Sequence, residues 1–284
     1  MLAEGLNRLI ILDRFLPLLS FKIGGVLFIV KNRSKWQRYM ELFIVVILVL
    51  SLWQWVVAQG YIADYLLPSP MQILNSLMAN RNLLWAHSKM TLYEAILGMG
   101  LGVGLGMVLA ILMAWVPFLD RIIYPLLIIS QTIPTVAIAP MLVLWFGYGI
   151  LPKVLLVILT TFFPITIGLL KGFNSVDEEV IRLMRSMKAT KVQMMRFVQF
   201  PTALPYFFTN LRLSASYAVV AAVVAEWLGG QSGLGVYMTL ARKSYAFDVM
   251  FAIIVVVSLL SLVLLKGVDI LEYICLPWRK KGKN

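Results

Sequence analysis

The chain has 284 residues, of which 61% are hydrophobic and 13% are charged, and its formal net charge is +12. A soluble domain is about 45–50% apolar and about 25% charged, so this composition excludes an ordinary soluble domain. Several stretches approach the roughly 20 apolar residues that cross a bilayer as a helix. The alternating segments of about ten residues that build an outer-membrane barrel are not visible. The sequence therefore predicts an all-α polytopic membrane protein.

Few residue types that carry catalysis or bind metals are present. Cys275 is the only cysteine and His87 the only histidine, which excludes an intrachain disulfide and argues against a zinc site. An intramembrane enzyme would have little from which to build a catalytic constellation. We assign the positive charge to cytoplasmic loops, where Lys and Arg collect in membrane proteins, and expect no nucleic-acid partner.

Residues 1–34 are expected to be an N-terminal extension that precedes the main domain. The segment is apolar, but Asp13, Arg14, Pro17 and Lys22 interrupt it. It fits an extra span, an interfacial helix or a signal-like segment without a small-residue cleavage site. A fourth alternative is a mature chain that begins near Val30, which an intact-mass measurement would distinguish.

Six apolar stretches have the length and composition of membrane spans. They lie at about 41–58, 91–115, 122–146, 153–170, 207–228 and 249–268. Placing both termini inside leaves most Lys and Arg residues in the cytoplasm, and puts Arg81, Lys89, Lys153, Arg242 and Lys243 outside. The positive-inside rule favours this orientation.

The segment between the first two spans predicts a short helix. Pro68 and Pro70 interrupt the backbone, and residues 71–79 have the pattern of an amphipathic helix at the outer surface. In the second span, Gly98, Gly102 and Gly106 share one helical face. Small residues four apart let helices approach closely in lipid, so this face is expected to pack against another span.

The third span contains Pro125, Pro134 and Pro140, an unusual density for one helix. Proline removes a backbone hydrogen bond and bends a helix, which membranes tolerate where neighbouring protein or water satisfies the freed carbonyl. We therefore expect a bent helix that lines a translocation pathway, although a kink that only packs is the alternative. The candidate pathway residues are Gln131, Thr132, Pro134, Tyr217 and Glu226. Trp145, Phe146 and Tyr148 are expected to anchor the membrane interface.

Residues 176–201, VDEEVIRLMRSMKATKVQMMRFVQFP, form a charged island in an apolar chain. Ser175 with Glu178, and Thr190 with Gln193, both match the capping-box pattern at a helix start. We predict two short helices, 176–187 and 191–199, joined at Lys188 and Ala189 and ended by Pro201. Their apolar stripe is expected to consist of Val180, Met184, Met187, Met195 and Val198, with a basic rim around it. Such a hairpin either lies on anionic lipid or docks on a soluble partner.

Glu226 lies at the outer end of the fifth apolar stretch. It either reaches the headgroup layer, lines a vestibule, or pairs with Arg242 or Lys243. Gly229, Gly230, Gly233 and Gly235 then predict a tight re-entrant loop before a short helix at 236–244.

The charged island resembles the cytoplasmic EAA loop of bacterial ABC import permeases, which reads E-A-A, three residues, G, nine residues, then I-x-L-P. Pro201 matches the proline of the motif, Phe200 and Val198 take its leucine and isoleucine places, and residues 182–184 take its E-A-A place. Lys188 stands in the place of the glycine, where a left-handed turn favours glycine, so the lysine is expected to strain the turn or to change the angle between the helices.

The resemblance extends over about residues 70–275, in SPMQIL, IPTVAIAPMLVLWFGYG and LPYFFTNLRLSASYAVVAAVVAEWLGGQSGLGVYM. These look like the subfamily that imports nitrate, sulfonates, taurine and thiamine pyrimidine precursors. The segment AEWLGG with GLGVYM is most similar to the permeases for pyrimidine precursors and related heterocycles. The resemblance implies a type I importer fold over 35–275 with a coupling hairpin at 171–205, a basic cytoplasmic tail at 276–284 and a location in the bacterial inner membrane.

The same resemblance implies the partners. They are ATPase subunits, an extracytoplasmic solute-binding protein, a second permease copy that makes a homodimer, and membrane lipid. No P-loop G-x-x-x-x-G-K-[ST] is present, so ATP and magnesium are expected on the partner and no cofactor on this chain. The residues expected to couple to the ATPase are Glu179, Arg182, Met184, Ser186, Lys188, Ala189, Thr190 and Pro201. An ion-coupled secondary transporter is the alternative from another class, and the scarcity of ionisable groups near the expected midplane argues against it.

Overall fold

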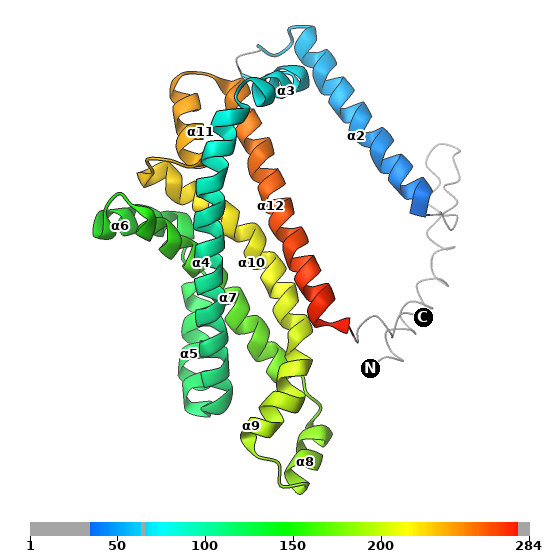
Figure 1. Ribbon diagram of the computed structural model, residues 1–284, viewed down its shortest axis with the longest axis vertical. Coiled ribbons are helices and arrows are strands. Elements are labelled where there is room, and N and C mark those ends of the chain that lie inside the picture. Colours follow the sequence, from blue (N-terminus) through cyan, green and yellow to red (C-terminus); the bar gives the residue numbers. More distant parts are fainter. Residues whose placement is uncertain (1–34, 64–65, 278–284) are drawn as a thin grey trace. The chain divides into compact units, whose positions relative to one another are not determined.

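The computed structural model describes residues 35–63 and 66–277, and every regular element in these ranges is a helix (Figure 1). The all-α prediction is thus confirmed. The expected N-terminal extension, with its four alternatives, and most of the basic tail lie outside the described residues. The chain divides into two units, residues 1–52 and 53–284. Helix α2 (Lys35–Ala58) crosses this boundary, and all further helices belong to the second unit.

Within the described residues, five helical segments are long and apolar enough to cross a membrane. They are Tyr39–Ala58 of α2, α4 (Arg81–Trp115), α7 (Ile150–Phe173), the continuous segment Lys191–Gly229 and α12 (Phe247–Cys275). Apart from the third, the expected spans correspond to these segments. Each segment begins before its predicted start, and the last three also end later than predicted.

The third expected span is two helices, which corrects the prediction of a single bent helix. α5 (Pro117–Ser130) and α6 (Thr135–Phe146) meet at a break with an angle of 96° between them. Pro134 is the N-cap residue of α6 and has an extended backbone. Because a proline has no N–H and disfavours helical geometry in the residue before it, residues 131–134 cannot carry α5 onward without a break. If the bent pair counts as one span, the total is six.

The core of the second unit is built on the contacts of α7 with α4 and α10 (Phe200–Gly229). On α4, a Cβ atom added to Gly98 would lie 2.5 Å from Val157 Cβ, and one added to Gly102 would lie 2.0 Å from Thr161 Oγ1. A Cβ on Gly106 would lie 2.9 Å from the carbonyl of Phe162, whereas Gly100 and Gly104 face open space. The predicted close-packing glycine face is confirmed, and its partner is α7.

Short helices lie at both ends of this bundle (Figure 1). α3 (Pro70–Ala79) and α11 (Leu234–Lys243) lie at one end, and both confirm predicted short helices. α3 begins with a capping box in which Ser69 and Gln72 exchange hydrogen bonds. α8 (Glu178–Ser186) and α9 (Lys191–Met194) lie at the opposite end.

The two short helices of the charged island differ in detail from the prediction. The capping box of Thr190 and Gln193 is present at the start of α9. The other predicted box is wrong: Asp177 caps α8 by accepting from the Glu179 N–H, while Ser175 Oγ donates to the Gly172 carbonyl. Asp177 takes this role because its carboxylate is a short acceptor directly before the first turn.

Pro201 does not end the second short helix, which corrects another expectation. α9 continues through a π-helical segment η2 (Met195–Gln199) into α10 (Phe200–Gly229). Pro201 follows the π-helical turn directly and lies in the first turn of α10. The hairpin is therefore joined to a membrane span by unbroken helical backbone.

Candidate functional site

A cavity of about 610 Å³ lies beside the break between α5 and α6, against α7 and α10. It lies midway between the two ends of the bundle, because its walls use the middle turns of α7 and α10. Of the predicted pathway residues, Gln131 and Tyr217 line it. Thr132 and Pro134 belong to the break but are not among the lining residues, and Glu226 lies elsewhere.

The walls of this cavity are mostly apolar, and no acidic or basic side chain is among the described residues that line it. Its polar side chains are Ser130, Gln131, Thr135, Thr160, Asn210 and Tyr217. An apolar cavity with a few placed polar groups is the usual form of a site for a small organic molecule.

A second cavity, of about 520 Å³, lies at the end of the bundle that carries α3. Gln72, Asn75 and Asp248 are among its lining residues, and Ser76 donates to the Asp248 carboxylate there. Close by, the Tyr237 hydroxyl donates to Asn80 Oδ1 at 3.2 Å. Burial, and then the charge of Asp248, raise the pKa of the Tyr237 phenol. These contacts tie α3 to α11 and α12.

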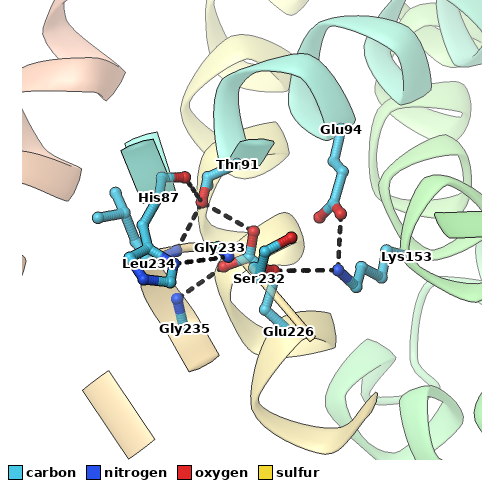
Figure 2. A network of polar contacts seen from close by, with 9 residues as sticks. All are labelled: His87, Thr91, Glu94, Lys153, Glu226, Ser232, Gly233, Leu234 and Gly235. Carbon is cyan, nitrogen blue, oxygen red and sulfur yellow. Dashed lines mark hydrogen bonds and ion pairs between the residues drawn. The ribbon is translucent and has the colours of Figure 1, made fainter. Parts of the chain in front are cut away.

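A buried polar network surrounds Glu226, which is 1% exposed (Figure 2). Its carboxylate accepts from Thr91 Oγ1 at 2.7 Å and from the Gly235 N–H at 2.6 Å. Thr91 Oγ1 in turn accepts from the Leu234 N–H at 2.8 Å, and His87 Nδ1 accepts from the Gly233 N–H at 3.0 Å. The carboxylate and α4 thus hold the loop between α10 and α11.

Glycine is required where this loop crosses the carboxylate. Gly233 has φ +122°, outside the range of side-chain-bearing residues, and a Cβ there would lie 2.0 Å from Glu226 Oε1. The tight loop predicted from the glycines is confirmed. The proposed pairing of Glu226 with Arg242 or Lys243 is wrong, because its carboxylate turns inward to backbone and hydroxyl donors.

A buried ion pair adjoins the network. Lys153 Nζ lies 2.6 Å from Glu94 Oε1 and also donates to the Ser232 carbonyl at 3.3 Å. Both side chains are almost completely buried. Lys153 was expected in the outer loop, and the structure places it in the first turn of α7, facing α4. Sequence reasoning missed this pair because its members lie 59 residues apart.

A further charge cluster joins α10 to α12. Arg212 Nε lies 2.6 Å from Asp269 Oδ1, and the same guanidinium contacts the Glu272 carboxylate. Together with Glu94 and Lys153, these residues put more ionisable groups inside the candidate spans than the sequence suggested. These charged side chains form ion pairs with one another and link α4 to α7 and α10 to α12.

No group of three or more potential metal-binding side chains occurs among the residues that the structure describes. The predicted coupling residues all lie on the hairpin or at its return into α10, at the end of the bundle away from α3 and α11 (Figure 1). Glu179, Arg182, Ser186, Lys188 and Thr190 are exposed; Met184, Ala189 and Pro201 are half-buried.

The hairpin exposes large apolar side chains. Met187 is 71%, Phe197 64% and Leu183 61% exposed. Met195, which was expected in the apolar stripe, instead packs into the main core. The exposed apolar set therefore differs from the predicted stripe, and it is flanked by the charged side chains of α8.

Lys188 has φ +58°, the left-handed conformation that glycine adopts most readily. The turn is held by the Lys188 N–H to the Arg185 carbonyl at 2.9 Å and the Ala189 N–H to the Met184 carbonyl at 3.0 Å. At the glycine place of the motif, the structure thus has a lysine in the left-handed conformation.

Comparison with known proteins places these features in a family. A family model described as binding-protein-dependent transport system inner membrane component matches residues 102–275. The formylaminopyrimidine transport permease protein ThiX of Halalkalibacterium halodurans is 40% identical over 218 residues, which cover 76% of this chain and 87% of ThiX. The taurine transport system permease protein TauC of Escherichia coli is 31% identical over 259 residues, which cover 87% of this chain and 94% of TauC.

Solved structures share the fold. A crystal structure of an amino acid ABC transporter with histidines aligns with a TM-score of 0.59 at 17% identity, covering 70% of this chain and 96% of that chain. The polytopic helical architecture is that of type I ABC importer permeases. Proteins of this family are membrane subunits, and the ATPase is a separate partner. The chain therefore belongs to the binding-protein-dependent transport system inner membrane components, the multi-pass permease subunits of ABC importers for small solutes.

Proposed function

We propose that this permease imports a thiamine pyrimidine precursor, a formylaminopyrimidine, or a closely related heterocycle. The observation that carries the proposal is the cavity beside the α5–α6 break, whose described lining contains no acidic or basic side chain. A sulfonate or nitrate keeps a full negative charge, and moving an ion into such a site without a counter-charge is costly. A neutral planar heterocycle meets no such penalty.

The ranking of relatives supports the same solute class. Identity to the formylaminopyrimidine permease is 40%, against 31% to the taurine permease. Nitrate, sulfonate or taurine is the alternative solute. The separate binding protein also selects the solute, in addition to the selectivity of the cavity.

The hairpin supports the proposed coupling mechanism. Its exposed apolar side chains, with charged neighbours, have the chemistry of a helix that docks in a groove on a soluble partner. ATP-driven closure of the two ATPase subunits would move α8 and α9. Because α9, η2 and α10 form one continuous helical segment, that motion would reach the cavity wall directly. The cavity would then alternate between the two sides of the membrane.

Two further parts of the proposal concern assembly and orientation. We place the hairpin and both termini in the cytoplasm and the α3–α11 end outside. Val220 in the cavity lining and Leu144 on α6 are exposed apolar side chains. Their exposure fits a second permease copy that closes the pathway between two chains.

The test is reconstitution. The chain is purified with its ATPase subunits and binding protein, inserted into liposomes and supplied with ATP and radiolabelled solute. We expect ATP-dependent uptake of formylaminopyrimidine that requires the binding protein, and no uptake of taurine. Uptake of taurine without uptake of the pyrimidine would contradict the solute class. Uptake driven by an ion gradient without ATP would contradict the mechanism.

A further inference from the structure

Thr160 on α7 and Asn210 on α10 both present hydrogen-bond acceptors to the cavity. Thr160 and Pro164 both line the cavity from α7. Pro164 lies inside this helix and has no N–H, so the carbonyl of Thr160, four residues earlier, lacks its helical donor. The Thr160 hydroxyl donates to the Val157 carbonyl at 2.9 Å, which uses its only proton. Thr160 therefore offers the cavity acceptors and no donor.

Asn210 adds another acceptor from α10. Its Nδ2 donates to the Tyr206 carbonyl at 2.8 Å. A carbonyl can only accept, so this bond determines which end of the amide faces the helix backbone and leaves Oδ1 as the free end. Asn210 lines the same cavity as Thr160.

Gly168 on α7 makes room for this amide. A Cβ added to Gly168 would lie 2.2 Å from Asn210 Nδ2 and 2.5 Å from its Cγ. Both distances are below any real contact, so a side chain at 168 would displace the amide. The absence of a side chain at 168 thus makes room for the amide of Asn210, and the hydrogen bond to the Tyr206 carbonyl orients it.

Helix α6 also has a carbonyl that lacks its helical donor because of a proline four residues later. Val136 lines the cavity from α6, and Pro140 lies four residues later inside that helix. The Val136 carbonyl therefore also lacks its helical donor. Phe163 and Tyr217 bring aromatic rings to the lining, which suits a flat ring between the walls.

We propose that the cavity recognises a planar heterocycle through the ligand's own N–H donors. Asn210 Oδ1 and the Thr160 carbonyl are the acceptors on the α7–α10 wall, and Asn210 determines specificity. An aminopyrimidine carries such donors on its exocyclic amine and its formamide. This inference rests on the proposed function for the identity of the solute, and it adds the preference of the cavity for N–H donors.

The experiment compares two solutes in the reconstituted complex, with the binding protein saturated by each. One is formylaminopyrimidine, and the other is the same compound with its exocyclic amine replaced by methyl. The readouts are uptake and binding-protein-stimulated ATP hydrolysis. One hydrogen bond changes an equilibrium by up to about tenfold, so we expect the wild type to move about tenfold more amino compound per ATP.

Asn210→Leu keeps the approximate size of the side chain and removes the acceptor. We expect it to lose the preference for the amino compound while ATP hydrolysis stays stimulated. Gly168→Ala, which displaces the amide without changing residue 210, is expected to weaken the preference too and serves if Asn210→Leu does not fold. Thr209→Val is the matched control, because its hydroxyl donates to the Pro205 carbonyl and it does not line the cavity.

The outcomes separate the two proposals. If the wild type takes up formylaminopyrimidine but both folded variants keep its preference, the role of Asn210 is wrong and the proposed function stands. If the wild type takes up no pyrimidine, the proposed function is wrong and this inference falls with it.

Discussion

The two ends of the bundle both concentrate charged residues, but they use them in opposite ways. At the α3–α11 end, Glu94, Lys153 and Glu226 are buried and bonded to helices and to the α10–α11 loop. At the hairpin end, Arg182, Arg185 and Lys188 are exposed beside exposed apolar side chains. A buried charge is tolerated when it is paired and hydrogen-bonded, and here the partners lie within the same chain. The buried charges of the first end are thus paired inside this subunit, whereas the exposed set at the second end has the composition of a surface that another protein covers.

The largest effect is expected from breaking the buried pair. Lys153→Met removes the ammonium and leaves the Glu94 carboxylate buried without its counter-charge. Leaving one member of a buried pair alone costs about 3–5 kcal/mol, so the melting temperature of the purified permease should fall strongly. The double variant Glu94→Gln with Lys153→Met should recover much of the loss. Equal melting temperatures for wild type and Lys153→Met would mean that the pair does not stabilise this end.

At the hairpin end, a substitution should weaken binding of the partner and leave the stability of the permease unchanged. Ala189→Glu puts a carboxylate at the turn between α8 and α9, where we expect the ATPase to dock. We predict a loss of ATPase affinity of about a hundredfold, which corresponds to about 2.7 kcal/mol, without a change in melting temperature. Co-purification with the ATPase and thermal unfolding measure the two quantities. Normal complex yield would show that the contact lies elsewhere.

The packed centre between the two ends offers a matched pair of glycines. Gly102→Ala would bring a Cβ within 2.0 Å of Thr161 Oγ1, whereas Gly100→Ala would meet nothing within 4 Å. Overpacking costs about 1–3 kcal/mol, so only the first variant should lower the melting temperature. If both variants have the same melting temperature, the close contact of α4 with α7 at Gly102 does not determine the stability.

The smallest effect is expected at the turn of the hairpin. Lys188→Gly relieves a left-handed conformation that costs a side-chain-bearing residue about 1 kcal/mol. Hydrogen exchange of the Ala189 amide, bonded to the Met184 carbonyl, should slow severalfold. Lys188→Ala keeps the Cβ and should show no such slowing. Faster exchange in the glycine variant would mean that the added chain entropy outweighs the relief of strain.

Local patterns in the sequence predicted a large part of this molecule. The capping box of Thr190 and Gln193 needs only four consecutive residues, and it is present. The packing face of Gly98, Gly102 and Gly106 follows from helical periodicity, and its close approach is confirmed. The failures were also local: Asp177 competed with Ser175 for the cap of α8, and Pro201 was taken as an end although it lies in a first helical turn.

The candidate site was predicted only in part. Gln131 and Tyr217 were identified because polar residues beside a proline-rich or apolar stretch stand out, and both line the cavity. Asn210 and Gly168 carried no such signal, since a single asparagine or glycine in an apolar run has many ordinary explanations. Only their contact across α7 and α10 shows that one makes room for the other.

The sequence alone determined the membrane class, most helices and the basic hairpin, because apolar length, helical period and capping depend on neighbours within a few residues. Tertiary structure decided which charges meet. Glu94 and Lys153 are 59 residues apart, and Thr91 and Glu226 are 135 apart. Their bonds exist only because α4, α7 and α10 pack together and exclude water, which makes each buried charge depend on a partner that no local pattern specifies.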